Sequence, residues 1–175
     1  MKLYLLLLPR IHELTRIKKI KAIPEVAGRT PFKRAKAILQ RQHPNNALFT
    51  EKIESYIDHM EQHIEISDDP LHFVHDNPGY TLEKQCHLYQ AAISGWDNTK
   101  WIYIINGKAW NFMDHMNMAT LVLHEVIYRL AYERGQLTST NTKLVVQALL
   151  TQDQFSDPNK FFDLRKKLDI VVAGE

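Results

Sequence analysis

The longest regular pattern of apolar positions lies between Asp114 and Gly135. Apolar residues fall at positions 118, 119, 121, 122, 123, 126, 127, 130 and 131, which cover more than the single stripe of a surface helix. Asp114 and Asn117 are suitable N-caps, and Gly135 is suited to end a helix. The pattern therefore predicts one long, mostly buried helix. Four polar residues lie within its apolar surface: His124, Glu125, Tyr128 and Arg129.

Shorter patterns on both sides of this segment predict further helices and a β-hairpin. Helices are expected over residues 11–23, from Thr30-Pro31 to about 42, from a cap at Asn45 or Asn46 to about 63, and over 140–151 and 158–168. Strands are expected over residues 71–75, 85–94 and 100–106, and turns over 67–70, 76–79 and 95–98. The last two strands and the turn between them form the expected hairpin.

These elements predict a single α+β domain over residues 1–175, with helices around a small antiparallel β-hairpin or sheet and a long buried central helix. Residues 81–151, the hairpin with the central and following helices, form its core. A chain of 175 residues with 45% hydrophobic content is long enough to bury such a core. The lone Cys86 excludes an intramolecular disulfide framework.

Charge is distributed unevenly along the chain, although the formal net charge is only +2. Residues 1–42 carry 11 Lys and Arg against 2 Asp and Glu, whereas residues 43–175 carry 11 against 18. Such a basic N-terminal helical arm can bind nucleic acid or an anionic membrane, or it can fold back on the acidic body. The arm residues considered for binding are Arg16, Lys18, Lys19, Lys21, Lys33, Arg34 and Lys36.

The first nine residues, Met1 to Pro9, leave two interpretations open. They resemble the start of a signal peptide, but their apolar run is short and no small-residue cleavage site follows. A buried strand or helix turn explains them equally well. No apolar run in the sequence reaches transmembrane length.

The His124-Glu125 pair resembles half of the H-E-x-x-H zinc helix, in which two histidines bind the metal and the glutamate activates water. Here Tyr128 occupies the second histidine position. A zinc site would use His124 as a ligand and Glu125 as the general base. Tyr128, or His115, His87 and Cys86 from elsewhere in the chain, would have to complete the coordination. The alternative is structural: His124 and Tyr128 hydrogen-bond into the core, while Glu125 and Arg129 form an i,i+4 ion pair. We favour the structural interpretation, because one His-Glu dipeptide is a weak motif.

A second histidine pair, His59 and His63, has the four-residue spacing of metal ligands on a helix. The positions around it are charged, which favours a solvated helix face over a metal site. Cys86 and His87 are neighbours on a predicted strand, so their side chains point to opposite faces and do not form a catalytic dyad.

Residues 121–129, L-V-L-H-E-V-I-Y-R, are followed by Gly135, Ser139 and Lys143. This pattern resembles a group of uncharacterised, mostly exported bacterial proteins with an L-H-E-x-I-Y-R helix, a glycine and an S-x-x-x-R segment. Upstream, residues 86–90, 101–105, 110 and 114–117 match the strands, tryptophan and cap of that group. Lys143 stands where the group has arginine, which weakens planar pairing with a carboxylate.

The resemblance covers about residues 81–151 and implies a fold and a structural cluster more than an activity. It adds Ser139 and Lys143 to His124, Glu125, Tyr128 and Arg129, and it implies an exported or periplasmic location. The leading expectation is a bacterial domain, non-enzymatic or of cryptic activity, in which this cluster is mainly structural. The alternatives are a degenerate zincin-like hydrolase and a polyanion binder acting through the basic arm.

Overall fold

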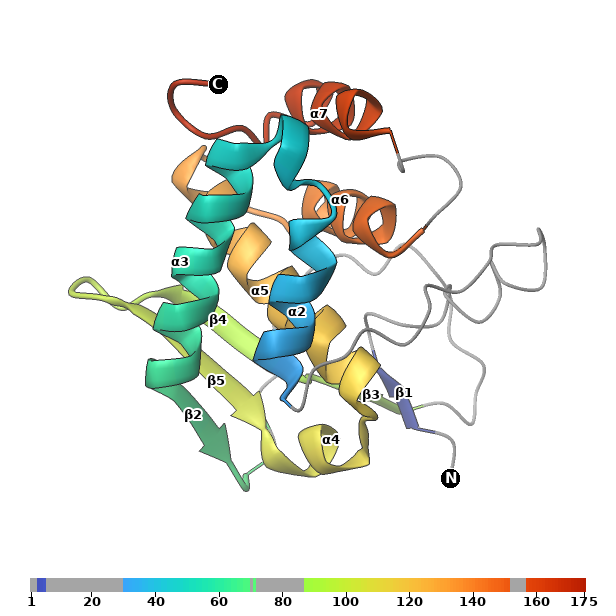
Figure 1. Ribbon diagram of the computed structural model, residues 1–175. Coiled ribbons are helices and arrows are strands. Elements are labelled where there is room, and N and C mark those ends of the chain that lie inside the picture. Colours follow the sequence, from blue (N-terminus) through green and yellow to red (C-terminus); the bar gives the residue numbers. More distant parts are fainter. Residues whose placement is uncertain (1–2, 6–29, 70, 72–86, 152–156) are drawn as a thin grey trace.

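Helix α5, His115–Glu133, runs through the middle of the structure and most other elements pack around it (Figure 1). The Asp114 carboxylate accepts a hydrogen bond from the backbone N–H of Asn117 at 2.8 Å, which caps its first turn. Gly135 follows its last turn with a φ of 83°, a left-handed conformation that glycine adopts at little cost. The long, mostly buried central helix predicted from the apolar pattern is confirmed.

The computed structural model describes residues 3–5, 30–69, 71, 87–151 and 157–175 of the chain. The helix predicted over residues 11–23, the strand over 71–75 and the turn over 76–79 therefore lie outside the described residues, apart from residue 71. Four of the basic-arm residues also lie outside: Arg16, Lys18, Lys19 and Lys21. In the described part, no helix is both long enough and apolar enough to cross a membrane.

Helices α2, Pro31–Gln40, and α3, Ala47–His63, pack against each other and against α5. Thr30 caps α2 by accepting a hydrogen bond from Lys33 N, and Pro31 occupies the first turn, as the sequence predicts. A short 3-10 turn, His43–Asn45, connects the two helices. Their buried apolar residues, among them Ile38 and Ile57, join those of α5 in one core.

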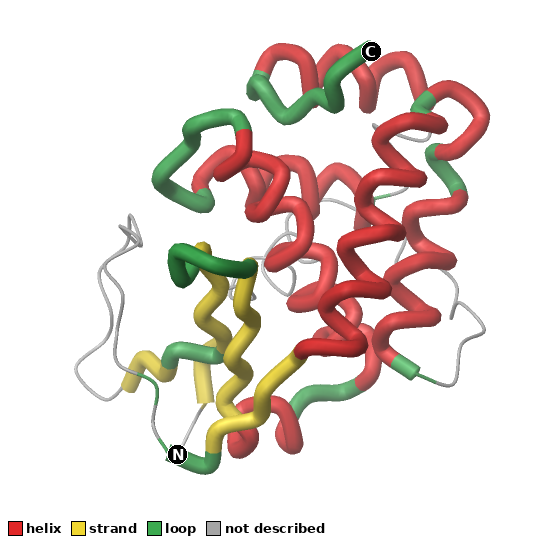
Figure 2. Tube along the Cα trace, turned by 90° about the vertical axis from the view of Figure 1, so that its left-hand side faces the viewer, coloured by secondary structure: helices red, strands yellow, loops and turns green. Residues whose placement is uncertain are grey.

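A three-stranded sheet lies on one side of the helices (Figure 2). Its order is β2, Ile64–Ser67, then β5, Trp101–Asn106, then β4, Ala92–Trp96. β4 and β5 form the expected antiparallel hairpin, with Trp96 opposite Trp101. β2 runs parallel to β5, so the sheet is mixed, and this third strand was not expected from the sequence.

The predicted strand over residues 85–94 is divided in two. β3, His87–Tyr89, pairs in parallel with β1, Leu3–Leu5, and the chain then enters β4. The hairpin turn lies at 97–100, slightly later than predicted, because the Asp97 carboxylate accepts hydrogen bonds from the backbone N–H groups of Thr99 and Lys100 at 2.9 and 2.8 Å. These bonds, with the one from Lys100 first, lower the pKa of Asp97 to about 2.

The chain after β5 is helical. The short α4, Gly107–Phe112, leads to α5, and α6, Thr140–Leu150, and α7, Pro158–Lys167, follow it. Asp157 caps α7 through Asn159 N at 2.9 Å, and Pro158 lies in its first turn. Both predicted C-terminal helices are confirmed, and with the sheet they give a single α+β domain.

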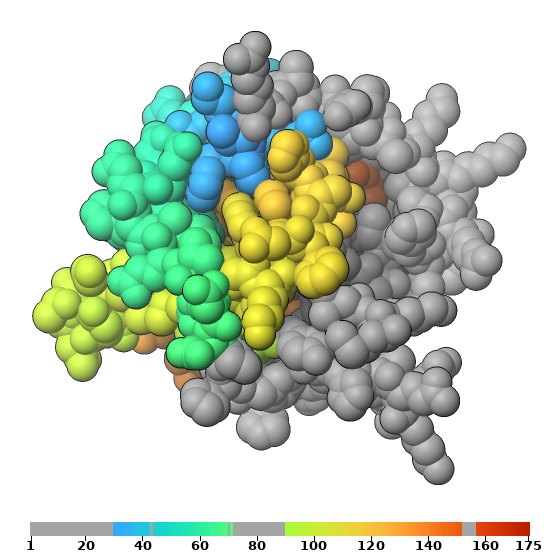
Figure 3. All heavy atoms as spheres, turned by 90° about the horizontal axis from the view of Figure 1, so that it is seen from below, coloured from blue at the N-terminus to red at the C-terminus, as the bar shows by residue number. Residues whose placement is uncertain are grey.

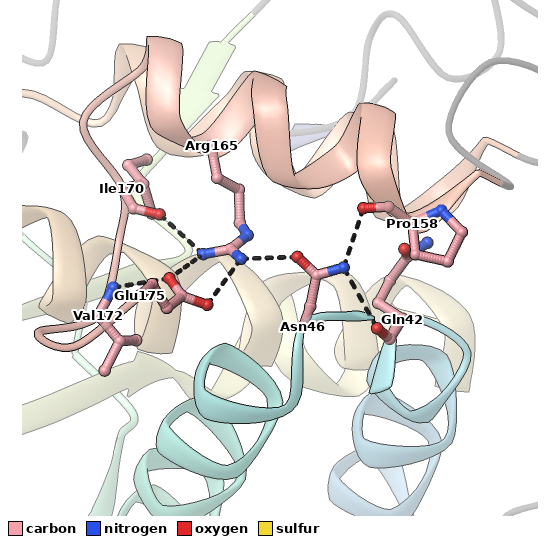
Figure 4. A network of polar contacts seen from close by, with 7 residues as sticks. All are labelled: Gln42, Asn46, Pro158, Arg165, Ile170, Val172 and Glu175. Atoms are coloured by element: carbon pink, nitrogen blue, oxygen red, sulfur yellow. Dashed lines mark hydrogen bonds and ion pairs between the residues drawn. The ribbon is translucent and has the colours of Figure 1, made fainter. Parts of the chain in front are cut away.

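The C-terminal tail is held to the body by Arg165 of α7, whose side chain has no exposed surface (Figure 4). Its guanidinium donates to both oxygens of the Glu175 carboxylate, at 2.8 and 2.9 Å, and to Asn46 Oδ1 at 2.7 Å. It also donates to the backbone oxygen of Ile170 at 3.2 Å and lies 4.1 Å from the centre of the Phe49 ring. One buried cation therefore joins α7, the tail and the start of α3.

Candidate functional site on helix α5

Glu125 faces the sheet. Its side chain is buried, and its carboxylate accepts a hydrogen bond of 2.6 Å from the hydroxyl of Ser94 in β4. Burial was expected, because apolar residues surround position 125 on the helix. The contact with Ser94 joins α5 to the central part of the hairpin. A hydrogen bond to a carboxylate in such surroundings stabilises by about 1.5–3 kcal/mol.

Arg129 faces α3 and β5. Its guanidinium lies 4.1 Å from the centre of the Tyr56 ring and 5.8 Å from that of Trp101, and it donates to the hydroxyl of Tyr103 at 3.5 Å. Its ion pair, Nε to Oε1 at 3.4 Å, is with Glu133. The expected ion pair between Glu125 and Arg129 stays a prediction. The contacts that the structure describes are those of Glu125 with Ser94 of β4 and of Arg129 with Glu133 and with aromatic rings on two other elements.

The two tyrosines beside Arg129 are protonated at neutral pH. Burial raises the pKa of Tyr103 to about 12, although the hydrogen bond and charge of Arg129 act in the opposite direction. Burial also raises the pKa of Tyr56, as do the hydrogen bond to Glu133, at 2.5 Å, and the negative charge of that residue. Both phenols therefore keep their protons at neutral pH: the Tyr56 hydroxyl donates to Glu133, and the Tyr103 hydroxyl accepts from Arg129.

Aromatic side chains from α3, β5 and α5 lie beside Arg129 or contact the rings that do, and we call them the aromatic belt: Tyr56, Trp101, Tyr103, Tyr128 and Tyr132. The ring of Trp101 lies 5.2 Å from that of Tyr132 and 6.5 Å from that of Tyr128, in edge-on arrangements. The sequence analysis missed the belt. Its signals were the four-residue spacing of the two α5 tyrosines and the alternation of Trp101 and Tyr103 on one face of β5.

The remaining members of the predicted cluster lie in α5, in α6 and at the start of α6. His124 is buried in α5, next to Glu125. Tyr128 donates to the backbone oxygen of Leu137 at 3.3 Å, in the connection to α6. Ser139 is buried at the N-cap of α6, and its backbone oxygen accepts from Lys143 N at 2.9 Å. The resemblance to the bacterial proteins implied that these residues form one group, and in the structure they lie along α5 and α6.

The structure keeps apart two of the proposed zinc ligands, His115 and His124. His115 is exposed in the first turn of α5, whereas His124 is buried nine residues further along the same helix. At a rise of about 1.5 Å per residue they are about 13 Å apart along the axis, so one ion cannot bind both. Across residues 30–69, 87–151 and 157–175, no three His, Cys, Asp or Glu side chains gather as a group that could hold a metal ion.

Three residues of the basic arm lie in α2, and two of them are engaged with the body. Lys36 forms an ion pair of 2.5 Å with Asp58 of α3, and Arg34 is buried. Lys33 is exposed. In its described portion, the arm thus packs on the acidic part of the chain, which is one of the three behaviours expected from its charge.

Comparison of the chain with family models, with curated proteins and with solved structures returned no match. The geometry of the described residues is therefore the basis for the functional argument.

Proposed function

We propose that this protein is a small non-enzymatic domain in which the polar residues of α5 have an architectural role. The observation that carries the proposal is the direction of two charged groups. Glu125 bonds to Ser94 of β4, and Arg129 contacts Tyr56 of α3 and Tyr103 of β5. Each charge fixes α5 to a different neighbouring element.

A catalytic role would place different demands on Glu125. A general base must reach a water molecule or a substrate proton at hydrogen-bonding distance. The Glu125 side chain is instead buried among core residues of α5 and bonded to a serine. The contacts of the described residues favour neither of the two alternatives, the zincin-like hydrolase with His124 as ligand and the polyanion binder acting through the basic arm.

The test compares Glu125→Gln, Ser94→Ala and the double variant by urea unfolding. Glutamine nearly preserves the shape of the side chain, so the change is mainly electrostatic. We expect Glu125→Gln to lower the unfolding free energy by more than about 1 kcal/mol, because a charge-assisted hydrogen bond is lost. Ser94→Ala should cost about 1.5–3 kcal/mol alone and clearly less when Glu125 is already glutamine.

The opposite result would favour an enzyme. Replacement of a catalytic glutamate often leaves stability unchanged or improves it, because active-site groups are selected for reactivity at the expense of stability. If Glu125→Gln is as stable as the unaltered protein, or more stable, the architectural proposal is refuted. Glu61→Gln, the same change at an exposed position on α3, serves as a control for the general effect of removing a carboxylate charge.

A further inference from the structure

Two stacked histidines, His59 and His63, lie where α3 meets β2. Their ring centres are 4.3 Å apart and the ring planes are inclined by 22°. His63 is the last residue of α3 and Ile64 is the first residue of β2, so no loop separates the pair from the strand. Figure 3 shows this segment, coloured teal to green, on the surface beside the hairpin.

The ring of His59 packs against the sheet and has little room for a second proton. It lies edge-on to Tyr103 of β5, with 6.0 Å between the ring centres. Its Nδ1 is buried and has no hydrogen-bond partner in the part of the chain that the structure describes. A protonated imidazole carries a hydrogen on both nitrogens. Protonation would therefore bury a charged N–H donor without an acceptor, which is unfavourable.

Positive groups also surround His59. Burial lowers the pKa of this imidazole, and the positive charges of Arg129 on α5, of His63 and of Lys100 in the hairpin turn lower it further. These cations come from three different parts of the fold. The neutral form of His59 is therefore the form that its surroundings stabilise.

The nearby carboxylates of α3 and β2 do not offset these cations. The α3 positions one turn before and after His59 hold serine, tyrosine, glutamine and histidine. Asp58 pairs with Lys36 on α2. Glu65 of β2 lies opposite Ile104, whereas Ile64 lies opposite Tyr103. Since successive side chains of a strand point to opposite faces, Glu65 lies on the other face of the sheet.

The carboxylates of α5 are engaged elsewhere. Glu133 accepts a hydrogen bond from the Tyr56 hydroxyl and pairs with Arg129 at 3.4 Å. Glu125 accepts from Ser94 of β4. Among the described residues, the charges that act on His59 are all positive.

The two rings differ in how readily they accept a proton. His63 is exposed, and it lies in the last turn of α3, where the helix dipole favours a cation. Its Nδ1 also donates to the backbone oxygen of His59 at 2.8 Å, because a carbonyl oxygen can only accept. A charge on His63 then opposes a second charge on the stacked ring of His59.

We propose that His59 and His63 form a pH-sensitive joint, in which acidification loosens the last turn of α3 together with β2. Two charged rings at this separation repel each other, and His59 is also repelled by Arg129 and Lys100. Movement of the His59 ring into water relieves the repulsion, but it removes the contact with Tyr103. β2 follows the helix, because no loop joins them and β2 lies at the end of the strand order, beside β5.

The direction of the pH effect follows from the lowered pKa of His59. The unfolded chain takes up this proton as the pH falls below about 6.5, whereas the folded chain takes it up only at a lower pH. The contribution of His59 to stability is therefore complete above about pH 6.5. It decreases as the pH falls from there to the lowered value. This response is independent of the architectural role of Glu125.

The first test measures the imidazole titrations by NMR in the full chain, with His59→Gln used to assign the His59 signal. We expect His59 to titrate below the usual value of about 6.5. Lys100→Gln removes one of the nearby cations at an exposed position and should shift the titration of His59 upward. Lys108→Gln, the same change at an exposed position on α4, should leave it unchanged.

The second test measures the response of the fold at about pH 7.5 and about pH 5.5, on either side of the usual histidine pKa. The urea midpoint should fall less on acidification in His59→Gln and in Lys100→Gln than in the unaltered protein. His115→Gln, which removes an exposed histidine at the other end of α5, should respond as the unaltered protein does. Hydrogen exchange at the β2 amides, corrected for the intrinsic rate, should accelerate at acid pH in the unaltered protein and much less in His59→Gln.

Three results would overturn the proposal. The first is a titration of His59 at or above the usual value. The second is an acid-induced fall of the urea midpoint that is the same in the unaltered protein and in Lys100→Gln or His59→Gln. The third is exchange at the β2 amides that acid pH leaves unchanged. Lys100→Gln lies on the surface and leaves the packing of α3 intact, so the comparison holds even if His59→Gln does not fold.

Discussion

Replacing Glu175 with glutamine removes the negative charge that faces a fully buried guanidinium. The side chains of Arg165 and Glu175 are 0% and 6% exposed, and two hydrogen bonds of 2.8 and 2.9 Å join them. After the replacement Arg165 keeps its bonds to Asn46 and to the backbone of Ile170. It loses the counter-charge, so a cation remains in the interior without compensation.

The expected cost follows from this geometry. Breaking a buried ion pair by removing one partner destabilises by about 3–5 kcal/mol. The glutamine amide still offers one oxygen to Arg165, which places the expected loss near the lower limit, about 3 kcal/mol. For a chain of this size, that loss corresponds to a fall in melting temperature of about 6–12 °C. Urea unfolding and calorimetry at neutral pH measure both quantities.

The pH dependence supplies a second readout of the same pair. Burial raises the pKa of Glu175, but the hydrogen bonds from Arg165 and Val172 N and the charge of Arg165 outweigh it, and the net pKa lies below the usual 4.5. The stabilisation is therefore complete above about pH 4.5 and is lost as the pH falls through the lowered value. The unaltered protein and Glu175→Gln should converge in stability at acid pH.

A neighbouring surface pair is the matched control. Arg134 and Asp169 are 3.2 Å apart, with side chains 43% and 60% exposed. Asp169→Asn should cost less than about 1 kcal/mol, as is usual for exposed ion pairs, and asparagine tolerates the left-handed φ of 53° at this position. Equal losses in the two variants at neutral pH, or an undiminished difference for Glu175→Gln at acid pH, would refute the reasoning.

Two further predictions concern the hydroxyl of Tyr103 and the end of α5. Burial raises the pKa of Tyr103 to about 12 from the usual 10, so the folded state holds this proton more tightly than the unfolded state. The free energy of unfolding should therefore fall as the pH rises from about 10 to about 12. Tyr103→Phe should reduce that slope in urea unfolding at alkaline pH. Gly135→Ala should lower the free energy of unfolding by about 1–2 kcal/mol, because φ is 83° at this position, although an added Cβ would meet nothing within 4 Å. Gly95 is equally open but has no positive φ, so Gly95→Ala should lie within about 0.5 kcal/mol of the unaltered protein.

Local signals were sufficient for most helices of the fold. The Asp114 cap, the glycine at 135 and the wide apolar surface between them define α5 within a residue or two. Thr30-Pro31 and Asp157-Pro158 similarly mark where α2 and α7 begin. Strand β2 could not be found in this way, because Ile64–Ser67 follows a helix without a break and is extended only through its parallel pairing with β5.

The candidate site shows the same division between local and distant causes. The burial of Glu125 follows from its neighbours on the helix, which the sequence displays. The sequence does not display which residues contact the Glu125 carboxylate and the Arg129 guanidinium. Ser94 and Tyr56 lie 31 and 73 positions away from them in the chain. Helical spacing suggested Glu125 as the partner of Arg129, but it did not indicate that aromatic rings on α3 and β5 contact the guanidinium. Residue spacing along one helix does not predict contacts of this kind, because they depend on how distant segments of the chain pack.

The junction between α3 and β2 constrains how the chain can change in length. His63 is the last residue of a helix about 25 Å long, and Ile64 is the first residue of a strand, with no loop between them. One inserted residue would turn the helix by about 100° relative to the strand, or exchange the two faces of β2. Insertions should therefore be tolerated in the exposed hairpin turn at 97–100. At the junction of α3 and β2 they should destabilise the fold, because the helix is joined directly to the strand by one peptide bond.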